Sequence, residues 1–148
     1  MDEQMCELPA FRTSDEEAAK ILRRHHTIAV VGCSTNPDKP SHFVPKYLQQ
    51  HGYRVLPVNP TAAGQRLLDE KVYGSLNEIP MAVEIVDIFR PPKDVPPIVE
   101  AAIAIGAKAI WMQEGIVSNE AAKRAKEAGL AVVMDTCMMK VHRAMGGR

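Results

Sequence analysis

The chain lacks the features that mark several large classes of protein. Its 18 basic and 18 acidic side chains cancel, and neither kind forms a block that would favour nucleic acid or an anionic membrane surface as a partner. No apolar run is long enough to cross a membrane. The three cysteines lack the spacing of a disulfide framework, which indicates a reducing, cytoplasmic compartment. We therefore expect a cytoplasmic protein that binds neither nucleic acid nor membranes.

Signatures of nucleotide hydrolysis, metal binding and secretion are missing as well. Nothing reads G-x-x-x-x-G-K-[ST], so the sequence has no P-loop. The histidines and cysteines have no metal-ligand spacing, and we expect no metal site. Residues 1–6 are acidic and lack the apolar stretch of a secretory signal.

Strand-like and helix-like segments alternate along the chain. Short runs of β-branched and apolar residues predict strands, and apolar residues at i, i+3 and i+4 predict helices between them. We expect helices over 14–24, 41–50, 95–103 and 118–128, and strands over 28–32, 54–58, 82–89, 109–112 and 130–134. This order predicts an α/β fold with residues 1–148 in one domain. The domain is a Rossmann-like, doubly wound parallel sheet of about five strands, preceded by an extension over 1–27 that carries a helix.

Two local signals refine the helix boundaries. Ser14 is expected to cap the first helix, with Glu17 at capping-box spacing. Pro45 is expected in the first turn of the second helix, because a proline further inside would remove a backbone hydrogen bond.

The first strand leads into a loop that suits a phosphate group. The strand stops at Gly32, which lets the backbone turn sharply. Ser34, Thr35 and Asn36 then offer hydroxyl and amide donors beside the free N–H groups at the start of the next helix. The helix dipole favours an anion at the same place.

The same loop lacks the pattern of a dinucleotide site. G-x-G-x-x-G is reduced to the single Gly32, and the second strand ends in Asn59 and Pro60 instead of the acid that binds ribose hydroxyls. The loop therefore suits phosphate without being tuned for NAD or for ATP hydrolysis. A small NAD(P)-dependent oxidoreductase is the leading enzymatic alternative.

Residues that follow the other strands should surround this loop, because ligands of doubly wound sheets bind beyond the carboxyl ends of the strands. Those residues are Gly32, Ser34, Asn59, Pro60, Phe89, Arg90, Gln113, Glu114, Gly115 and Asp135. Arg90 gives the crevice a positive charge that pairs well with phosphate oxygens, and Lys39 can add a second. For Glu114, we expect the backbone and not the carboxylate to face a phosphate.

Three segments, 52–60 (GYRVLPVNP), 86–91 (VDIFRP) and 110–116 (IWMQEGI), together carry a family resemblance. From about residue 28 to 142, the chain resembles the small stand-alone coenzyme A-binding proteins. These share the fold of the N-terminal domain of the succinyl-CoA synthetase α subunit. The resemblance implies that coenzyme A is the cofactor and that its phosphates meet residues 34–37. Together with Gly32 and Lys39 from the loop, it predicts a coenzyme-binding set: Gly32, Ser34, Thr35, Asn36, Pro37, Lys39, Val58, Asn59, Pro60, Phe89, Arg90, Pro91, Gln113, Glu114 and Gly115.

The resemblance is incomplete. The synthetase loop is richer in glycine than residues 33–37, and the synthetase has a phosphohistidine on a second domain beyond this length. We therefore expect no ligase chemistry from this chain alone and no catalytic residue. The expected function is a non-catalytic sensor, buffer or carrier of CoA or acyl-CoA. The alternative is a subunit that completes an acyl-CoA synthetase in trans with a protein partner.

Two cysteines allow chemical interpretations. Cys137 and His142 suggest a nucleophile and its base, but no third group is identifiable beside them. Cys33 is either a thiol whose pKa the helix N-terminus lowers or a small residue that fits a tight loop.

Overall fold

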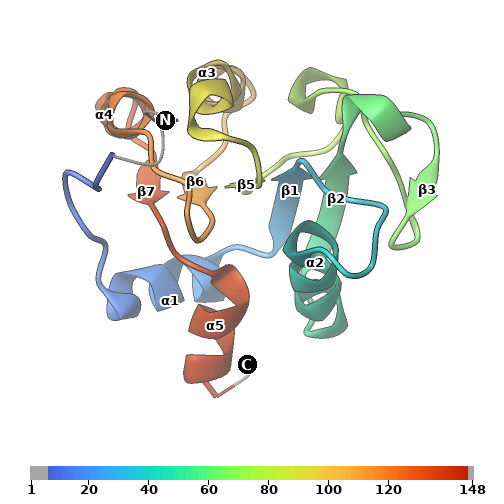
Figure 1. The fold of residues 1–148 in the computed structure, drawn as a ribbon, viewed down its shortest axis with the longest axis horizontal. Coiled ribbons are helices and arrows are strands. Elements are labelled where there is room, and N and C mark those ends of the chain that lie inside the picture. Colours follow the sequence, from blue (N-terminus) through green and yellow to red (C-terminus); the bar gives the residue numbers. More distant parts are fainter. Residues whose placement is uncertain (1–6, 147–148) are drawn as a thin grey trace.

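Five short parallel strands form the sheet at the centre of the computed structural model, which describes residues 7–146 (Figure 1). Their order across the sheet is β2-β1-β5-β6-β7. The strands are β1 (Thr27–Val31), β2 (Arg54–Val58), β5 (Ile85–Ile88), β6 (Ala109–Met112) and β7 (Ala131–Val133). The predicted Rossmann-like α/β fold is confirmed. Because the chain winds outward to β2 and then returns to β5, the winding reverses between β1 and β5.

Helices cover both faces of the sheet (Figure 1). One face packs against α1 (Asp15–Arg24), α2 (Pro40–Gln50) and α5 (Met138–Ala144). The other packs against α3 (Val95–Ala104) and α4 (Asn119–Glu127). Successive strand residues point to opposite faces of the sheet. From β1, Ile28 and Val30 join the core under α1, α2 and α5, and Ala29 and Val31 join the core under α3 and α4. Burial on both faces explains why the strands read as continuous apolar runs.

The first helix begins as the sequence predicts. Ser14 is its N-cap, and the Ser14 hydroxyl accepts a hydrogen bond from the Glu17 N–H at 3.1 Å. This contact satisfies one of the donors that a helix start leaves free.

The prediction for Pro45 is wrong. Helix α2 begins at Pro40, so Pro45 lies at its sixth position and not in its first turn. A proline there leaves the carbonyl of Ser41 without its helical donor. The N–H of Ser34, in the loop before the helix, donates to that carbonyl at 3.1 Å. The loop thus supplies the hydrogen bond that the helix lacks.

The sequence pattern did not predict several elements. Strands β3 (Arg66–Leu67) and β4 (Glu70–Lys71) form a hairpin whose turn residues Leu68 and Asp69 have positive φ angles of 54° and 60°. Such turns favour Gly, Asn or Asp at both positions, and the leucine at the first position hides this one from the sequence pattern. Helix α5 is short and was not predicted, and β5 is shorter than the expected strand over 82–89. Short 3₁₀ helices span Pro60–Ala62, Leu76–Glu78 and Pro92–Asp94.

Between residues 7 and 146, no helix is long and apolar enough to cross a membrane. The N-terminal segment 1–6, on which the expected lack of a secretory signal rests, lies outside the described residues.

Candidate functional site

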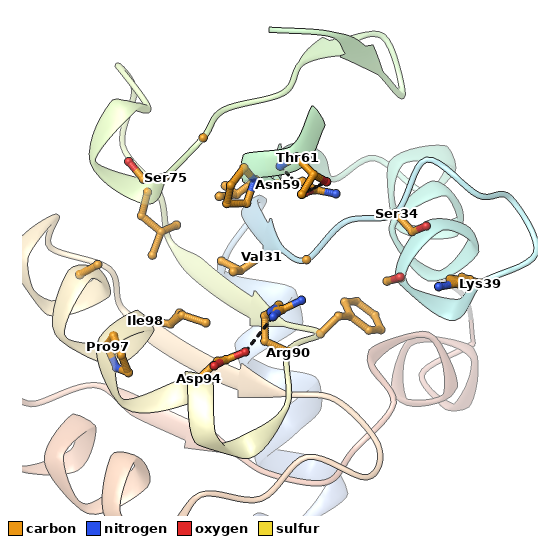
Figure 2. A pocket seen from close by; sticks show the side chains of 18 residues that line it. Val31, Ser34, Lys39, Asn59, Thr61, Ser75, Arg90, Asp94, Pro97 and Ile98 are labelled. Carbon is orange, nitrogen blue, oxygen red and sulfur yellow. Dashed lines mark hydrogen bonds and ion pairs between the residues drawn. The ribbon is translucent and has the colours of Figure 1, made fainter. Parts of the chain in front are cut away.

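A cleft of about 690 Å³ lies beyond the carboxyl ends of β1, β2 and β5, where the winding of the sheet reverses (Figure 2). Doubly wound sheets bind their ligands at this position. Of the predicted residues, eight line this cleft: Gly32, Ser34, Lys39, Val58, Asn59, Pro60, Phe89 and Arg90. Further lining residues, which the sequence analysis did not assign, come from two segments. Gly74, Ser75 and Leu76 precede β5, whereas Asp94, Pro97, Ile98 and Ala101 belong to α3 and the short 3₁₀ helix before it.

Gly32 lets the loops after β1 and β5 come close together. Its φ is +89°, and its N–H donates to the carbonyl of Val58 at 2.9 Å. A Cβ atom at this position would lie 2.7 Å from the carbonyl oxygen of Phe89 and 3.1 Å from Cδ of Arg90. Glycine is therefore required by the neighbouring backbone as well as by the turn.

Asn59, which follows β2, holds the loop after β1 beside Gly32. Its Nδ2 donates to the carbonyl of Cys33 at 2.9 Å. Its Oδ1 accepts from both the N–H and the hydroxyl of Thr61, at 3.0 and 2.8 Å. The side chain thus stands where a dinucleotide-binding protein has its ribose-binding acid, but its oxygen is engaged within the protein.

The loop before α2 is held by its own side chains. The Ser34 hydroxyl accepts the N–H of Asn36 at 3.0 Å, and Asn36 Oδ1 accepts the N–H of Asp38 at 3.0 Å. Ser34 and Lys39 face the first cleft, whereas Thr35, Asn36 and Pro37 are exposed and do not line it. These bonds give the loop one defined shape around the start of the helix.

Two cationic side chains, Arg90 and Lys39, border the cleft, and Figure 2 shows them on different sides of it. The guanidinium of Arg90 pairs with the carboxylate of Asp94 at 2.8 Å, with 49% of the Arg90 side chain exposed. Asp94 thus offsets part of the positive charge that the sequence analysis assigned to Arg90.

The predicted residues from the loops after β5, β6 and β7 line neighbouring clefts. Pro91, Gln113, Glu114 and Gly115 border a second cleft of about 430 Å³. Asp135 borders a third of about 540 Å³, which also contains Glu114. Asp135 Oδ1 accepts the N–H of Gly115 at 2.7 Å, so it orders the loop after β6. The single crevice expected at the sheet edge is therefore divided into adjoining clefts.

A buried carboxylate lies under the second cleft and was missed by the sequence analysis. Asp87 in β5 is fully buried, and its Oδ1 accepts from Nε2 of Gln113 at 2.6 Å. Within residues 7–146, its Oδ2 has no hydrogen-bond partner. Burial raises the pKa of Asp87 to about 7, although hydrogen bonds from Gln113 and the Ile88 N–H act in the opposite direction. An acidic residue inside an otherwise apolar strand was the available signal.

Gln113 connects this carboxylate to the last helix. Its Oε1 accepts the N–H of Met138, the first residue of α5, at 3.2 Å. The predicted site residue Gln113 therefore supports the structure, with 2% of its surface exposed.

The cysteines differ in their surroundings. Cys33 is fully buried, and burial together with the charge of Asp87 raises the pKa of its thiol to about 12. The hypothesis of a reactive thiolate at Cys33 is therefore wrong, and the small side chain fills a tight loop. Cys137 is half-buried at the second cleft. His142 is fully buried, with Nδ1 2.8 Å from the hydroxyl oxygen of Tyr47. Within the described part of the chain, no three His, Cys, Asp or Glu side chains could hold a metal ion.

Known proteins are similar to this chain in fold and sequence. The chain is 40% identical over 129 residues to the uncharacterized protein YneT of Bacillus subtilis, covering 87% of this chain and 94% of that protein. A hypothetical protein from Pyrococcus horikoshii OT3 has 41% identity and a TM-score of 0.87, covering 99% of this chain and 100% of that one. Neither description states a function.

A third relative is an enzyme. Acetate–CoA ligase [ADP-forming] II of Archaeoglobus fulgidus is 31% identical over 102 residues, covering 68% of this chain and 15% of the ligase. The match is thus confined to a small part of that enzyme, and it confirms the resemblance to a synthetase domain. The family described as CoA binding domain matches residues 26–143. The chain belongs to the CoA-binding domain family.

Proposed function

We propose that this protein binds coenzyme A or one of its acyl thioesters in the first cleft, and acts in the cytoplasm as a non-catalytic sensor, buffer or carrier. The observation that carries the proposal is the position of the cleft. This member of the CoA-binding domain family has a cleft of about 690 Å³ where the winding of its sheet reverses. The cleft is bordered by a loop suited to phosphate and by two cationic side chains.

The phosphate groups are assigned to the end of the cleft near the start of α2. Ser34 and Lys39 lie together at that end in Figure 2, and Lys39 is the N-cap residue of the 11-residue helix. A helix start of this length adds the positive end of its dipole. Arg90 reaches the same ligand from the loop after β5, and a guanidinium can pair with two phosphate oxygens at once.

The nucleotide base is assigned to the opposite end. Pro60, Leu76 and Ile98 provide apolar surface there, and the hydroxyls of Thr61 and Ser75 lie within the same lining. Small-molecule sites commonly combine a mostly apolar wall with a few polar groups that fix orientation. Figure 2 shows Ser34 and Lys39 across the cleft from Ile98, an arrangement that suits a ligand with phosphates at one end of its nucleotide and a flat base at the other.

The geometry disfavours a nicotinamide dinucleotide. Asn59 Oδ1 is occupied by the two donors of Thr61, so it is not available to accept from the ribose hydroxyls that an acid binds in dinucleotide sites. The loop also lacks the second and third glycines of the dinucleotide-binding pattern. The alternative function is a subunit that completes an acyl-CoA synthetase together with a separate protein. This alternative is supported by the acetate–CoA ligase, in which a region similar to this chain is part of a much longer enzyme.

Isothermal titration calorimetry with CoA and NAD tests the proposal. We expect CoA to bind and NAD to give no heat of binding at the same concentrations. Native mass spectrometry of the freshly purified protein should show the mass of any ligand that is retained. Tighter binding of NAD than of CoA would contradict the proposal and favour the oxidoreductase alternative.

A further inference from the structure

The second cleft adjoins the proposed coenzyme site. It has a volume of about 430 Å³ and shares four lining residues with the first cleft: Lys39, Ser41, Phe89 and Arg90. Lys39 and Ser41 belong to the start of α2, and Phe89 and Arg90 follow β5. The two clefts therefore meet between these two segments, and a long ligand in the first has a direct path into the second.

The inner wall of the second cleft is apolar. Val44 on α2 is 2% exposed, and Pro92 and Ile116 are half-buried on the opposite side. The amide of Gln113 lies among them, but its Nε2 already donates to Asp87 and its Oε1 already accepts from Met138. This wall offers contact to methylene groups.

The charged groups of the second cleft are Lys39, Arg90 and Glu114, which are exposed and lie at its rim. The side chains of Arg90 and Glu114 are 49% and 62% exposed, and each is paired with a neighbour, Asp94 and Lys140 respectively. The interior is therefore suited to an uncharged group, because a carboxylate at the end of the acyl chain would lie against the apolar inner wall without a partner.

We propose that the second cleft binds the acyl group of a short-chain, uncharged acyl-CoA, so that the protein selects the thioester over free CoA. The inference rests on the proposed function of the first cleft. A pantetheine arm that leaves the first cleft between Ser41 and Phe89 carries its thioester toward Val44 and Ile116. The volume of the second cleft lies near the lower end of the range for small-molecule sites, about 300–1,000 Å³, and limits the length of the acyl chain.

Calorimetric titration of the whole chain with CoA, acetyl-CoA, butanoyl-CoA and succinyl-CoA tests this inference. Each buried methylene should tighten binding by about fourfold, so we expect butanoyl-CoA, with two more methylenes, to bind about fifteenfold more tightly than acetyl-CoA. Succinyl-CoA should gain nothing over free CoA. Equal dissociation constants for CoA and butanoyl-CoA would overturn the inference and leave the proposed function standing. Absence of binding by all four ligands would contradict the proposed function itself.

Three substitutions locate the acyl group. Ile116→Trp fills the second cleft and should remove the preference for butanoyl-CoA over free CoA. Ile116→Ala enlarges the cleft and should move the preference toward longer chains, which keeps the test valid if the tryptophan variant does not fold. Ile103→Trp is the matched control, because Ile103 is also partly buried but lines neither cleft. A butanoyl preference that survives in both Ile116 variants would place the acyl group elsewhere and overturn the inference.

Discussion

The N–H of Ser34 donates to the carbonyl of Ser41 at 3.1 Å, and this bond ties the loop of the candidate site to the first turn of α2. The carbonyl is available because Pro45, four residues further on, has no N–H to offer it. A proline inside a helix normally weakens it, whereas here its missing donor is replaced by one from the ligand-binding loop. The proline inside α2 thus affects the shape of the candidate site.

Replacing Pro45 by Ala should separate stability from binding. Alanine restores a helical N–H that competes with Ser34 for the Ser41 carbonyl, and it removes a helix-interior proline whose cost is about 3 kcal/mol. Pro45 is buried, so the loss of its ring contacts offsets part of that gain. We expect the melting temperature to be unchanged or higher and the affinity for CoA to fall several-fold. Thermal unfolding and calorimetry on the same variant provide the check; an unchanged affinity would show that this bond does not shape the site.

The prediction for Pro45 illustrates where sequence reasoning about this fold stops. The strands of the sheet were predicted because each is a short apolar run, and burial on both faces of a parallel sheet requires that pattern. The position of α2 depends instead on a hydrogen bond to a residue outside the helix. Helix rules describe donors within the helix, so they exclude an interior proline that the tertiary structure accommodates.

The candidate site, like the fold, was predicted from the sequence only in part. The predicted topology alone places Gly32, Asn59 and Arg90 at one edge of the sheet, because the carboxyl ends of parallel strands share that edge. It could not show that the edge is divided into separate clefts, nor that Asp94 pairs with Arg90 from the next turn of the chain. Those details depend on side-chain directions in loops, for which no periodic pattern exists.

Two glycines with similar backbone angles should respond differently to alanine. Gly32 and Gly52 have φ angles of +89° and +96°, so each Gly→Ala change forces an L-residue into the left-handed region at a cost of about 1–2 kcal/mol. At Gly52 nothing lies within 4 Å of the added Cβ, whereas at Gly32 the carbonyl oxygen of Phe89 lies at 2.7 Å. Chemical denaturation should therefore show a larger loss of unfolding free energy for Gly32→Ala than for Gly52→Ala.

The same pair tests the site. Because the clash at Gly32 displaces the backbone of Phe89, only Gly32→Ala should also weaken CoA binding per folded molecule. Circular dichroism gives the folded fraction in each titration. Equal losses of stability in the two variants would mean that the contact between Gly32 and Phe89 is not tight in solution.

Arg90 and Asp94 should have opposite effects on binding. Arg90→Ala removes a cation from the cleft and should weaken CoA binding by about 1.5–3 kcal/mol, the range for hydrogen bonds to charged groups. Asp94→Asn releases Arg90 from its partner and should strengthen binding by about 0.2–1 kcal/mol. Because this ion pair is exposed, neither change should alter the unfolding free energy by more than about 1 kcal/mol. A large fall in melting temperature with unchanged affinity for Arg90→Ala would make Arg90 a structural residue.

The buried carboxylate of Asp87 should make stability depend on pH. Its pKa is raised to about 7 in the folded protein, whereas an unfolded aspartate titrates near 3.9. Between these values the folded state binds more protons than the unfolded state, so the unfolding free energy falls as the pH rises from about 4 to about 7. Protonated Asp87 supplies a donor as well as an acceptor inside the core, and the ionised form must be held there without a partner for its Oδ2 among residues 7–146.

Asp87→Asn isolates this contribution. Asparagine keeps an oxygen that can accept from Gln113 Nε2, and it cannot ionise. The variant should match the wild type at pH 4 and exceed it in stability at pH 7 and above, by a few kcal/mol at most. Urea unfolding of both proteins from pH 4 to pH 8 measures the difference, in which other titrating groups cancel. The neighbouring thiol of Cys33 does not interfere, because burial raises its pKa to about 12. Parallel curves for the two proteins would show that Asp87 titrates alike in the folded and unfolded states.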